Sequence, residues 1–158
     1  MTVVGSWRSW TKGSTSMRFV DVNVLVDAHR PESTKHPQVS IWLERARRGR
    51  EPLGLPSVVA SGFIRIVTHP RVFKEPTPVE VALSFVDGLL ASPAVVPVMI
   101  GDRHWEIFRD LCRRYMLTGN DVPDAYLAAL VIEQSATWVT SDRGFERFAS
   151  LRVEYPAG

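Results

Sequence analysis

The stretch Arg18-Phe-Val-Asp-Val-Asn-Val-Leu-Val26 decides the fold of this 158-residue chain. Its residues are mostly β-branched or aromatic and nearly all apolar, which is typical of a strand covered on both faces of a sheet. We therefore predict a buried strand over residues 18–26. Asp21 stands inside this strand, where a lone carboxylate is costly unless a metal ion, an arginine or backbone donors neutralise it.

Helical and strand patterns alternate through the rest of the sequence. Short apolar runs predict further strands, and between them apolar residues recur every three or four positions, as on one face of a helix. The predicted strands are 53–55, 94–98, 137–140 and 151–155. The predicted helices are 37–49, 57–68, one opened by the capping box Thr77-Pro-Val-Glu80, 102–116, 124–133 and 143–149. This alternation predicts a three-layer α/β/α sandwich with a central parallel sheet of four to five strands.

The composition indicates one globular domain. Hydrophobic residues make up 45% of the chain, a normal share for a folded protein of this length. Residues 1–16 are rich in Ser, Thr and Gly without periodicity, so we expect a flexible tail there and a folded domain over 17–158. Trp105, in the predicted helix 102–116, is expected in the core because of its spacing from Phe108 and Cys112.

The sequence also points to a compartment. No apolar run approaches the roughly 20 residues that span a bilayer, and the N-terminus lacks the apolar centre of a secretory signal. The single cysteine, Cys112, excludes an internal disulfide and fits a reducing environment. We therefore expect a cytoplasmic protein that does not contact a membrane.

Three aspartates are predicted to meet at one edge of the sheet. Asp21 belongs to the first strand, Asp142 follows the strand 137–140, and Asp124 opens the apolar helix just before that strand. Ligands of parallel sheets bind beyond the carboxyl ends of the strands, where these side chains would converge. Taken singly, Asp124 and Asp142 could instead be helix caps, whereas a strand interior offers Asp21 no cap to make.

These segments resemble the motifs of PIN-domain nucleases. Phe19–Ala28 resembles their opening Asp-x-Asn-x-Leu pattern, Val122–Leu130 their central helix, and Trp138–Phe145 their Thr-x-Asp-x-x-Phe segment. Gly62–Phe73 resembles one branch of the family, the VapC-type toxins of toxin–antitoxin pairs. The resemblance runs from about Met17 to Tyr155, nearly the whole chain without its first residues.

The resemblance implies a Mg²⁺-dependent endoribonuclease, with Mn²⁺ as a possible substitute, that cleaves structured tRNA, rRNA or mRNA and so inhibits translation and growth. Asp21 and Asp124 would be the principal metal ligands, and Asp142 a further ligand or the group that orients a metal-bound water. Asn23 and Thr140 would hold the carboxylates in place. The implied partners are a cognate antitoxin, the RNA substrate and a second copy of the chain as a homodimer.

One departure from the family pattern leaves alternatives open. Many PIN nucleases carry a glutamate on the helix after the second strand, but residues 57–63 contain no acid. Asp121 is the nearest replacement by sequence as a metal ligand, or it is an ordinary loop residue. The alternative function is a catalytically weak or inactive PIN-like module that binds RNA or a protein partner. A receiver-like phosphoryl-transfer domain fits less well, because no lysine lies beyond Lys74.

Overall fold

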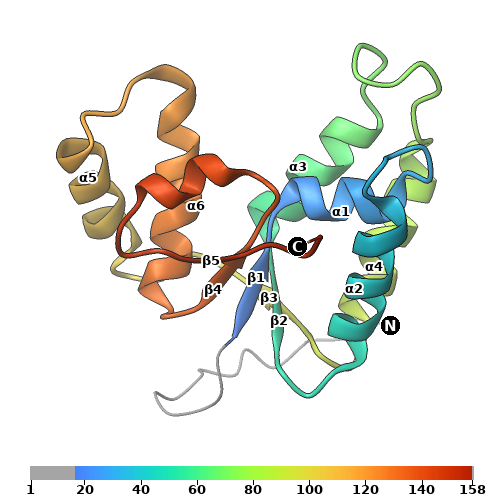
Figure 1. Ribbon diagram of the computed structural model, residues 1–158, viewed down its shortest axis with the longest axis horizontal. Coiled ribbons are helices and arrows are strands. Elements are labelled where there is room, and N and C mark those ends of the chain that lie inside the picture. Colours follow the sequence, from blue (N-terminus) through green and yellow to red (C-terminus); the bar gives the residue numbers. More distant parts are fainter. Residues whose placement is uncertain (1–16, 158) are drawn as a thin grey trace.

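The computed structural model describes residues 17–157. A five-stranded parallel sheet runs through the centre of the molecule (Figure 1). The flexible tail predicted for residues 1–16 lies outside the described residues. The strand order is β3-β2-β1-β4-β5, so the first strand of the chain is the middle of the sheet. The strands are β1 (Arg18–Val20), β2 (Leu53–Pro56), β3 (Val95–Val98), β4 (Thr137–Val139) and β5 (Arg152–Glu154).

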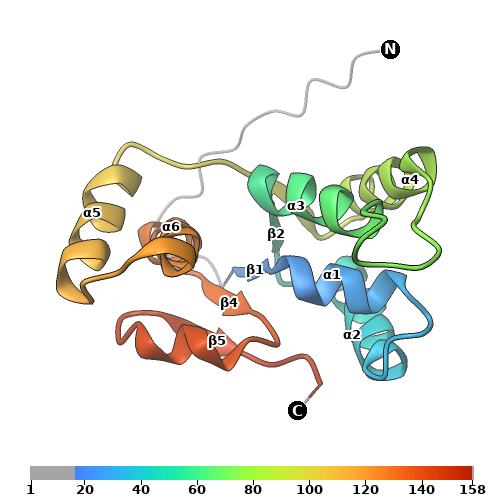
Figure 2. The ribbon, with the colours of Figure 1, turned by 90° about the horizontal axis from the view of Figure 1, so that it is seen from above.

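Helices cover both faces of this sheet. Figure 2 shows α5 and α6 on one side and α1 to α4 on the other, which confirms the predicted three-layer α/β/α sandwich. The α-helices are α1 (Val22–His29), α2 (His36–Arg48), α3 (Ser57–Val67), α4 (Val79–Leu90), α5 (His104–Arg114) and α6 (Val122–Glu133). Two short 3-10 helices, η1 (Gly119–Asp121) and η2 (Arg143–Arg147), flank α6 and β4 in the chain.

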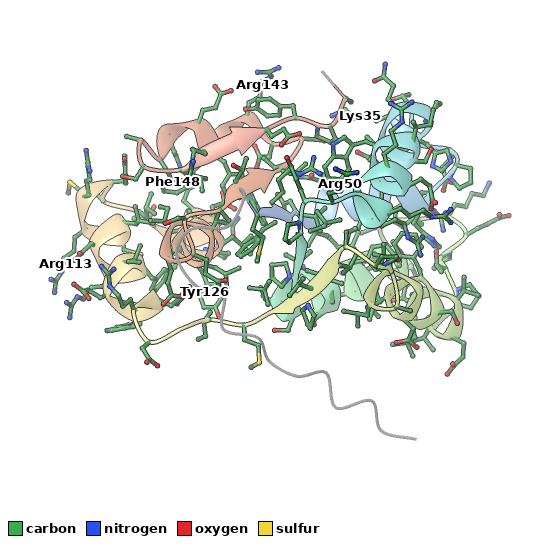
Figure 3. The ribbon with its side chains drawn as sticks, turned by 90° about the horizontal axis from the view of Figure 1, so that it is seen from below. Lys35, Arg50, Arg113, Tyr126, Arg143 and Phe148 are labelled. Atoms are coloured by element: carbon green, nitrogen blue, oxygen red, sulfur yellow. The ribbon has the colours of Figure 1, made fainter. Side chains whose placement is uncertain are left out.

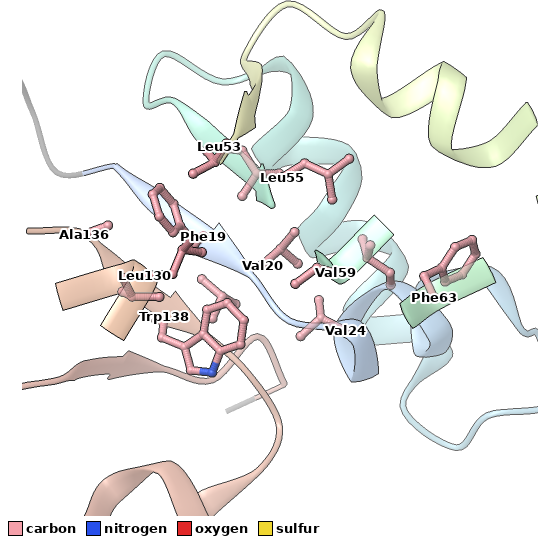
Figure 4. Packing of buried hydrophobic residues seen from close by; sticks show 14 of the residues in the cluster. Phe19, Val20, Val24, Leu53, Leu55, Val59, Phe63, Leu130, Ala136 and Trp138 are labelled. Atoms are coloured by element: carbon pink, nitrogen blue, oxygen red, sulfur yellow. The ribbon is translucent and has the colours of Figure 1, made fainter. Parts of the chain in front are cut away.

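The core lies between the sheet and each helical layer. Phe19 of β1 and Trp138 of β4 are fully buried, and Leu130 of α6 lies near Trp138 (Figure 4). Val59 and Phe63 of α3, also fully buried, fill the opposite side of the sheet. The two apolar layers hold the carboxyl ends of β1 and β4 side by side, with Val20 paired to Val139.

The predicted strand over residues 18–26 is wrong beyond Val20. β1 ends there, and Asp21 is the N-cap of α1, its side chain accepting a 2.7 Å hydrogen bond from the Val22 backbone N–H. Valine has a low helix propensity, but the fully buried Val24 and Leu25 anchor α1 in the core. The cap and the packing together outweigh the local preference for a strand.

Two smaller predictions are also wrong. The capping box at Thr77 does not form, since α4 begins at Val79 with Pro78 as an N-cap that makes no side-chain bond. The Thr77 hydroxyl oxygen instead accepts a hydrogen bond from Arg30. Trp105 is not in the core: it is 65% exposed, because α5 begins at His104 and turns the buried His104 inward in its place.

Over residues 17–157, no helix has both the length and the apolar composition to cross a membrane.

Candidate functional site

A pocket of about 350 Å³ opens at the carboxyl edge of the sheet, where β1 and β4 end. It brings together the three aspartates that sequence reasoning predicted to converge. The lining comes from α1, α3, α6 and the segment after β4, and consists of Asp21, Val22, Asn23, Val26, Asp27, Ile66, Asp124, Leu127, Asp142 and Phe145.

Asp21 is the most buried acid of the pocket, with 6% of its surface exposed. Burial raises the pKa of its carboxyl from 3.8 to about 6, against the hydrogen bonds from Thr140 and Val22, which lower it. The negative charges of Asp142 and Asp124 raise this pKa further. A buried carboxylate beside two others is a position where a bound cation would relieve both the desolvation and the repulsion.

Thr140 and Asn23 both donate hydrogen bonds to the Asp21 carboxylate. Asp21 Oδ2 accepts hydrogen bonds from Thr140 Oγ1 at 2.7 Å and from Asn23 Nδ2 at 3.2 Å. Asn23 Nδ2 also reaches Thr140 Oγ1 at 3.1 Å, and Asn23 Oδ1 accepts from the Ser141 backbone N–H at 3.0 Å. The end of β4 and the start of α1 are therefore joined by side chains around one carboxylate.

Asp142 has the capping role that was the alternative for it, and it lines the pocket as well. It is the N-cap of η2, and its Oδ1 accepts a 2.8 Å hydrogen bond from the Gly144 backbone N–H. The Asp142 backbone N–H donates to Thr140 Oγ1 at 3.0 Å, which ties this acid to the Asp21 cluster.

Asp124 is not a helix cap. It is the third residue of α6, and its Oδ2 accepts a 3.0 Å hydrogen bond from Arg147 Nη2. Asp121, the candidate replacement for the missing glutamate, lies at the end of η1 with a largely exposed side chain. It is 3.5 Å from Arg147 Nη2 and is not among the residues that line the pocket. On α3, where the family glutamate would be expected, the pocket-lining residue is the apolar Ile66.

Sequence reasoning missed two residues near these acids. Asp27 lines the pocket from α1 and accepts a 2.7 Å hydrogen bond from Ser33 Oγ. Reading residues 22–29 as a helix would have placed Asn23 and Asp27 one turn apart on the same face. Arg147 of η2 was missed because nothing in its local sequence separates it from a surface arginine.

The oxygen donors of the pocket fit a hard divalent cation. In residues 17–157, no three His, Cys, Asp or Glu side chains are already grouped as a metal site. Mg²⁺ does not need such a cage, because it binds through one or two carboxylates and keeps several waters. Asp21, buried with a raised pKa, and Asp124, which lines the same pocket, supply that number of carboxylates.

A parallel α/β/α fold with aspartates gathered at its carboxyl edge defines a class of small domains with an acidic site. The chain belongs to the PIN domain family, whose sequence model matches residues 18–151. It is 50% identical over 140 residues to the VapC ribonuclease Mb2897 of Mycobacterium bovis, a match that covers 89% of this chain and 95% of that one. It is 38% identical to ribonuclease VapC25 of Mycobacterium tuberculosis, over 86% of this chain and 96% of that one. These relatives confirm the resemblance to VapC-type proteins.

Solved structures confirm the fold. VapBC2 from Rickettsia felis, bound to a DNA fragment from its promoter, matches with a TM-score of 0.62 at 17% identity, covering 88% of this chain and 98% of that chain. VapC20 from Mycobacterium tuberculosis, a toxin that cleaves the sarcin–ricin loop, matches with a TM-score of 0.61 at 14% identity, over 82% and 93% of the two chains.

Proposed function

We propose that this protein is a Mg²⁺-dependent endoribonuclease, the toxin of a toxin–antitoxin pair. The observation that carries the proposal is the convergence of Asp21, Asp124 and Asp142 on one pocket, with Asp21 buried and its pKa raised to about 6. Relatives named as VapC ribonucleases support the choice of RNA as substrate.

Each acid has a role in the proposal. When bound, a divalent ion lowers the pKa of an attacking water and stabilises the charge that develops on the phosphate. Asp21 and Asp124 would hold this ion, and Asp142 would hold it or orient a water. Asn23 and Thr140 keep the Asp21 carboxylate aimed at the pocket through the hydrogen bonds described above. Mn²⁺, which accepts the same oxygen donors, would substitute.

The substrate in this proposal is structured cellular RNA, whether tRNA, rRNA or mRNA. The pocket is a small opening between α1 and α6, so a base-paired helix would reach it less easily than a loop with splayed bases. Cleavage of such RNA would inhibit translation and growth. We expect the protein to act in the cytoplasm, where these RNAs are.

The test is RNA cleavage by Asp21→Asn and Asp124→Asn in Mg²⁺. We expect at least about 100-fold loss of rate, because each change removes a charged oxygen donor. Asp110→Asn, on the exposed face of α5, is the matched control and should cleave as the unchanged protein does. Undiminished cleavage by both active-site variants would overturn the proposal. Mg²⁺ binding without cleavage of any RNA would favour the inactive binding module.

The proposal includes two protein partners. The first is a cognate antitoxin with a segment that lies over the pocket, where an arginine could pair with the carboxylates. Solved neighbours that are toxin–antitoxin complexes support this partner. Co-expression with the product of the adjacent gene should suppress both RNA cleavage and growth inhibition.

The second partner is another copy of the chain. Met99, Ile100 and Trp105 expose 57%, 49% and 65% of their surface close together in the chain, at the end of β3 and the start of α5. Apolar exposure of this kind favours association through that surface. Trp105→Glu should shift the mass measured by light scattering from dimer to monomer, whereas Met116→Glu, at a more exposed methionine after the end of α5, should not.

A further inference from the structure

We propose that Arg147 is a positioning residue of the acidic pocket, which fixes the Asp124 carboxylate relative to Asp142. The inference rests on the proposed function, since it concerns how this chain aligns two of the acids that would share a metal ion. Arg147 belongs to η2, which begins directly after Asp142, while Asp124 lies 23 positions earlier in the chain.

A continuous hydrogen-bonded path joins the two aspartates through Arg147. Asp142 Oδ1 accepts from the Gly144 backbone N–H at 2.8 Å, and the Gly144 carbonyl oxygen accepts from Arg147 Nη1 at 2.8 Å. Arg147 Nη2 then donates to Asp124 Oδ2 at 3.0 Å. Because the two donors of the planar guanidinium are held in a fixed geometry, the position of the Gly144 carbonyl restricts that of the Asp124 carboxylate. A lysine ammonium, which is a point charge, could not do this.

The path continues to Asp21. The Asp142 backbone N–H donates to Thr140 Oγ1, which in turn donates to Asp21 Oδ2. Asp21, Asp124 and Asp142 are therefore connected, and Arg147 supplies the connection to Asp124 on α6. Without Arg147, the Asp124 carboxylate would have no hydrogen bond to any other side chain or backbone group of residues 17–157, and its orientation would depend on its own rotamers.

Arg147 acts on Asp124 from outside the pocket. Arg147 is not among the pocket-lining residues, whereas Asp124 is. Its guanidinium engages Oδ2 of Asp124, and the same Nη2 lies 3.5 Å from Asp121 Oδ1. Arg147 therefore occupies only one oxygen of Asp124, so that Oδ1 is free to bind a ligand in the pocket. Asp121 is a second anion that pairs with Arg147.

The residues around Arg147 favour its contact with Asp124. Its Cζ lies 4.7 Å from the centroid of the buried Phe148 ring, and its Nε is buried without a partner among the described residues. Leaving that donor unpaired is unfavourable, so the contacts of Nη1 and Nη2 must offset its cost. A Cβ on Gly144 would come within 3.1 Å of Arg147 Nη1, so glycine leaves the space for the guanidinium.

The neighbouring Arg143 provides the contrast. It is on the same short helix, but its side chain is 68% exposed, pairs with Glu146 and lies over the Tyr155 ring. Figure 3 shows it projecting outward at the edge of the molecule. Within the described residues, the Arg143 side chain forms no hydrogen bond or ion pair with an aspartate of the pocket, and so it supplies a matched control.

Arg147 could also act in the opposite way, as an internal cation that competes with the metal. The two roles predict opposite signs. A competitor, once removed, would let the metal bind more tightly, because a positive charge near the site has gone. A positioning residue, once removed, would let the metal bind more weakly, because outer-shell partners that orient a ligand typically contribute about 10- to 100-fold in affinity or activity.

The experiment measures Mn²⁺ binding to the full chain by electron paramagnetic resonance, in which free Mn²⁺ gives the signal. Arg147→Met keeps the length of the side chain and removes its donors and charge. Arg147→Lys keeps the charge but cannot bridge Gly144 and Asp124 together. We expect about 10-fold weaker binding for the methionine variant, a smaller loss for the lysine variant, and no change for Arg143→Met.

Cleavage kinetics supply the second readout. Since Arg147 lies outside the pocket, its loss should lower kcat and leave the KM for RNA unchanged, a split that general loss of structure would not produce. Unchanged or tighter Mn²⁺ binding by folded Arg147→Met would overturn the inference. If that variant does not fold, Arg147→Lys decides, and binding equal to that of the unchanged protein would overturn it. If the unchanged protein neither binds Mn²⁺ nor cleaves RNA, the proposed function fails and this inference with it.

Discussion

Thr140 Oγ1 lies 2.7 Å from Asp21 Oδ2, and the Thr140 hydroxyl donates a hydrogen bond to this buried carboxylate. The assignment of the proton follows from the other contacts of the same oxygen, which accepts hydrogen bonds from Asn23 Nδ2 and from the Asp142 backbone N–H. Both neighbours are donors, so only the carboxylate can receive the proton. Thr140 is fully buried and therefore works as a fixed donor between two strand ends.

The first prediction concerns this hydroxyl. Thr140→Val keeps the shape of the side chain but removes the shorter of the two hydrogen bonds to Asp21 Oδ2 and leaves the Asp142 backbone N–H without its partner. Unpaired buried groups cost about 1–3 kcal/mol each, so the free energy of unfolding should fall by about 2 kcal/mol. Because Asp21 loses its alignment, RNA cleavage should fall by about 10- to 100-fold. Urea denaturation and cleavage kinetics measure the two effects.

Thr137→Val is the control for that change. Thr137 is the first residue of β4, the strand that Thr140 directly follows; its backbone pairs with Arg18 and Met17, and it is outside the pocket. Its substitution should change neither stability nor cleavage appreciably, since valine suits a strand position. Equal effects at the two positions would show that Thr140 has no special relation to Asp21.

The second prediction concerns the pH dependence of stability without metal. The pKa of Asp21 is about 6 in the folded protein and 3.8 as the ordinary value, so folding favours the neutral carboxyl. This contribution to stability is fully present below the unfolded pKa and is lost as the pH rises through the folded one. From about pH 4 to pH 8, the stability of the metal-free protein relative to Asp21→Asn should fall by roughly 2–3 kcal/mol.

The measurement is urea denaturation of both proteins in EDTA across that range of pH. Using the difference between them removes the titration of the other acids, which the two proteins share. Added Mn²⁺ should stabilise the unchanged protein increasingly as the pH rises, because the metal needs the ionised carboxylate. A difference that stays constant with pH would mean that Asp21 titrates normally and is not held in a desolvated site.

The sequence was sufficient to predict the sheet and the convergence of the acids, for a simple geometric reason. Parallel strands end at the same edge, so residues that follow β1 and β4 must meet there wherever the helices run. Asp142 is placed by that rule and Asp124 by the helix that precedes β4, whereas Asp21 was predicted inside a longer first strand and follows β1 only because this strand ends at Val20. The roles of Asn23 and Thr140 came instead from the resemblance to PIN-domain nucleases, which implied that they hold the carboxylates in place.

The break after Val20 and the role of Arg147 could not be predicted in the same way. Residues 22–26 alternate valine with other residues, which favours a strand locally, and only the cap at Asp21 and the burial of Val24 decide for a helix. Arg147 reaches an acid 23 positions away through a turn whose geometry depends on Gly144. Such a contact arises from packing and leaves no periodic pattern.

The third prediction concerns the close approach of β2 to Phe19. A Cβ built on Gly54 would lie 2.4 Å from Phe19 Cδ1 and 2.9 Å from Val98 Cγ2, in the fully packed core. Gly54→Ala should therefore lower the free energy of unfolding by about 3 kcal/mol, since the buried ring has no room to move. Gly88→Ala, in the last turn of α4, where a Cβ would have Arg47 Nη2 as its nearest neighbour at 3.8 Å, should instead raise it by roughly 0.5–1 kcal/mol. Effects of the same sign would contradict this account of the core.

The last prediction separates stability from catalysis at Arg30, the residue that follows α1. Arg30 Nη1 donates to Thr77 Oγ1 at 3.0 Å, Nη2 donates to the Glu75 carbonyl oxygen at 2.9 Å, and the Phe73 ring centroid lies 4.1 Å from its Cζ. These contacts bind the α3–α4 connection to the end of α1. They border a cavity of about 820 Å³ that none of the aspartates of the acidic pocket lines.

Arg30→Lys keeps the charge but loses the fork of donors and the planar group over the ring, so stability should fall by about 2 kcal/mol. Arg30 does not line the acidic pocket, and RNA cleavage by the folded variant should stay within about twofold of that of the unchanged protein. Arg65→Lys, at an exposed position of α3, should alter neither quantity. Thermal denaturation and cleavage well below the melting temperature test both halves. A large loss of cleavage with the fold intact would assign the α3–α4 connection to the substrate-binding surface, because the fastened loop would then matter for RNA rather than for folding alone.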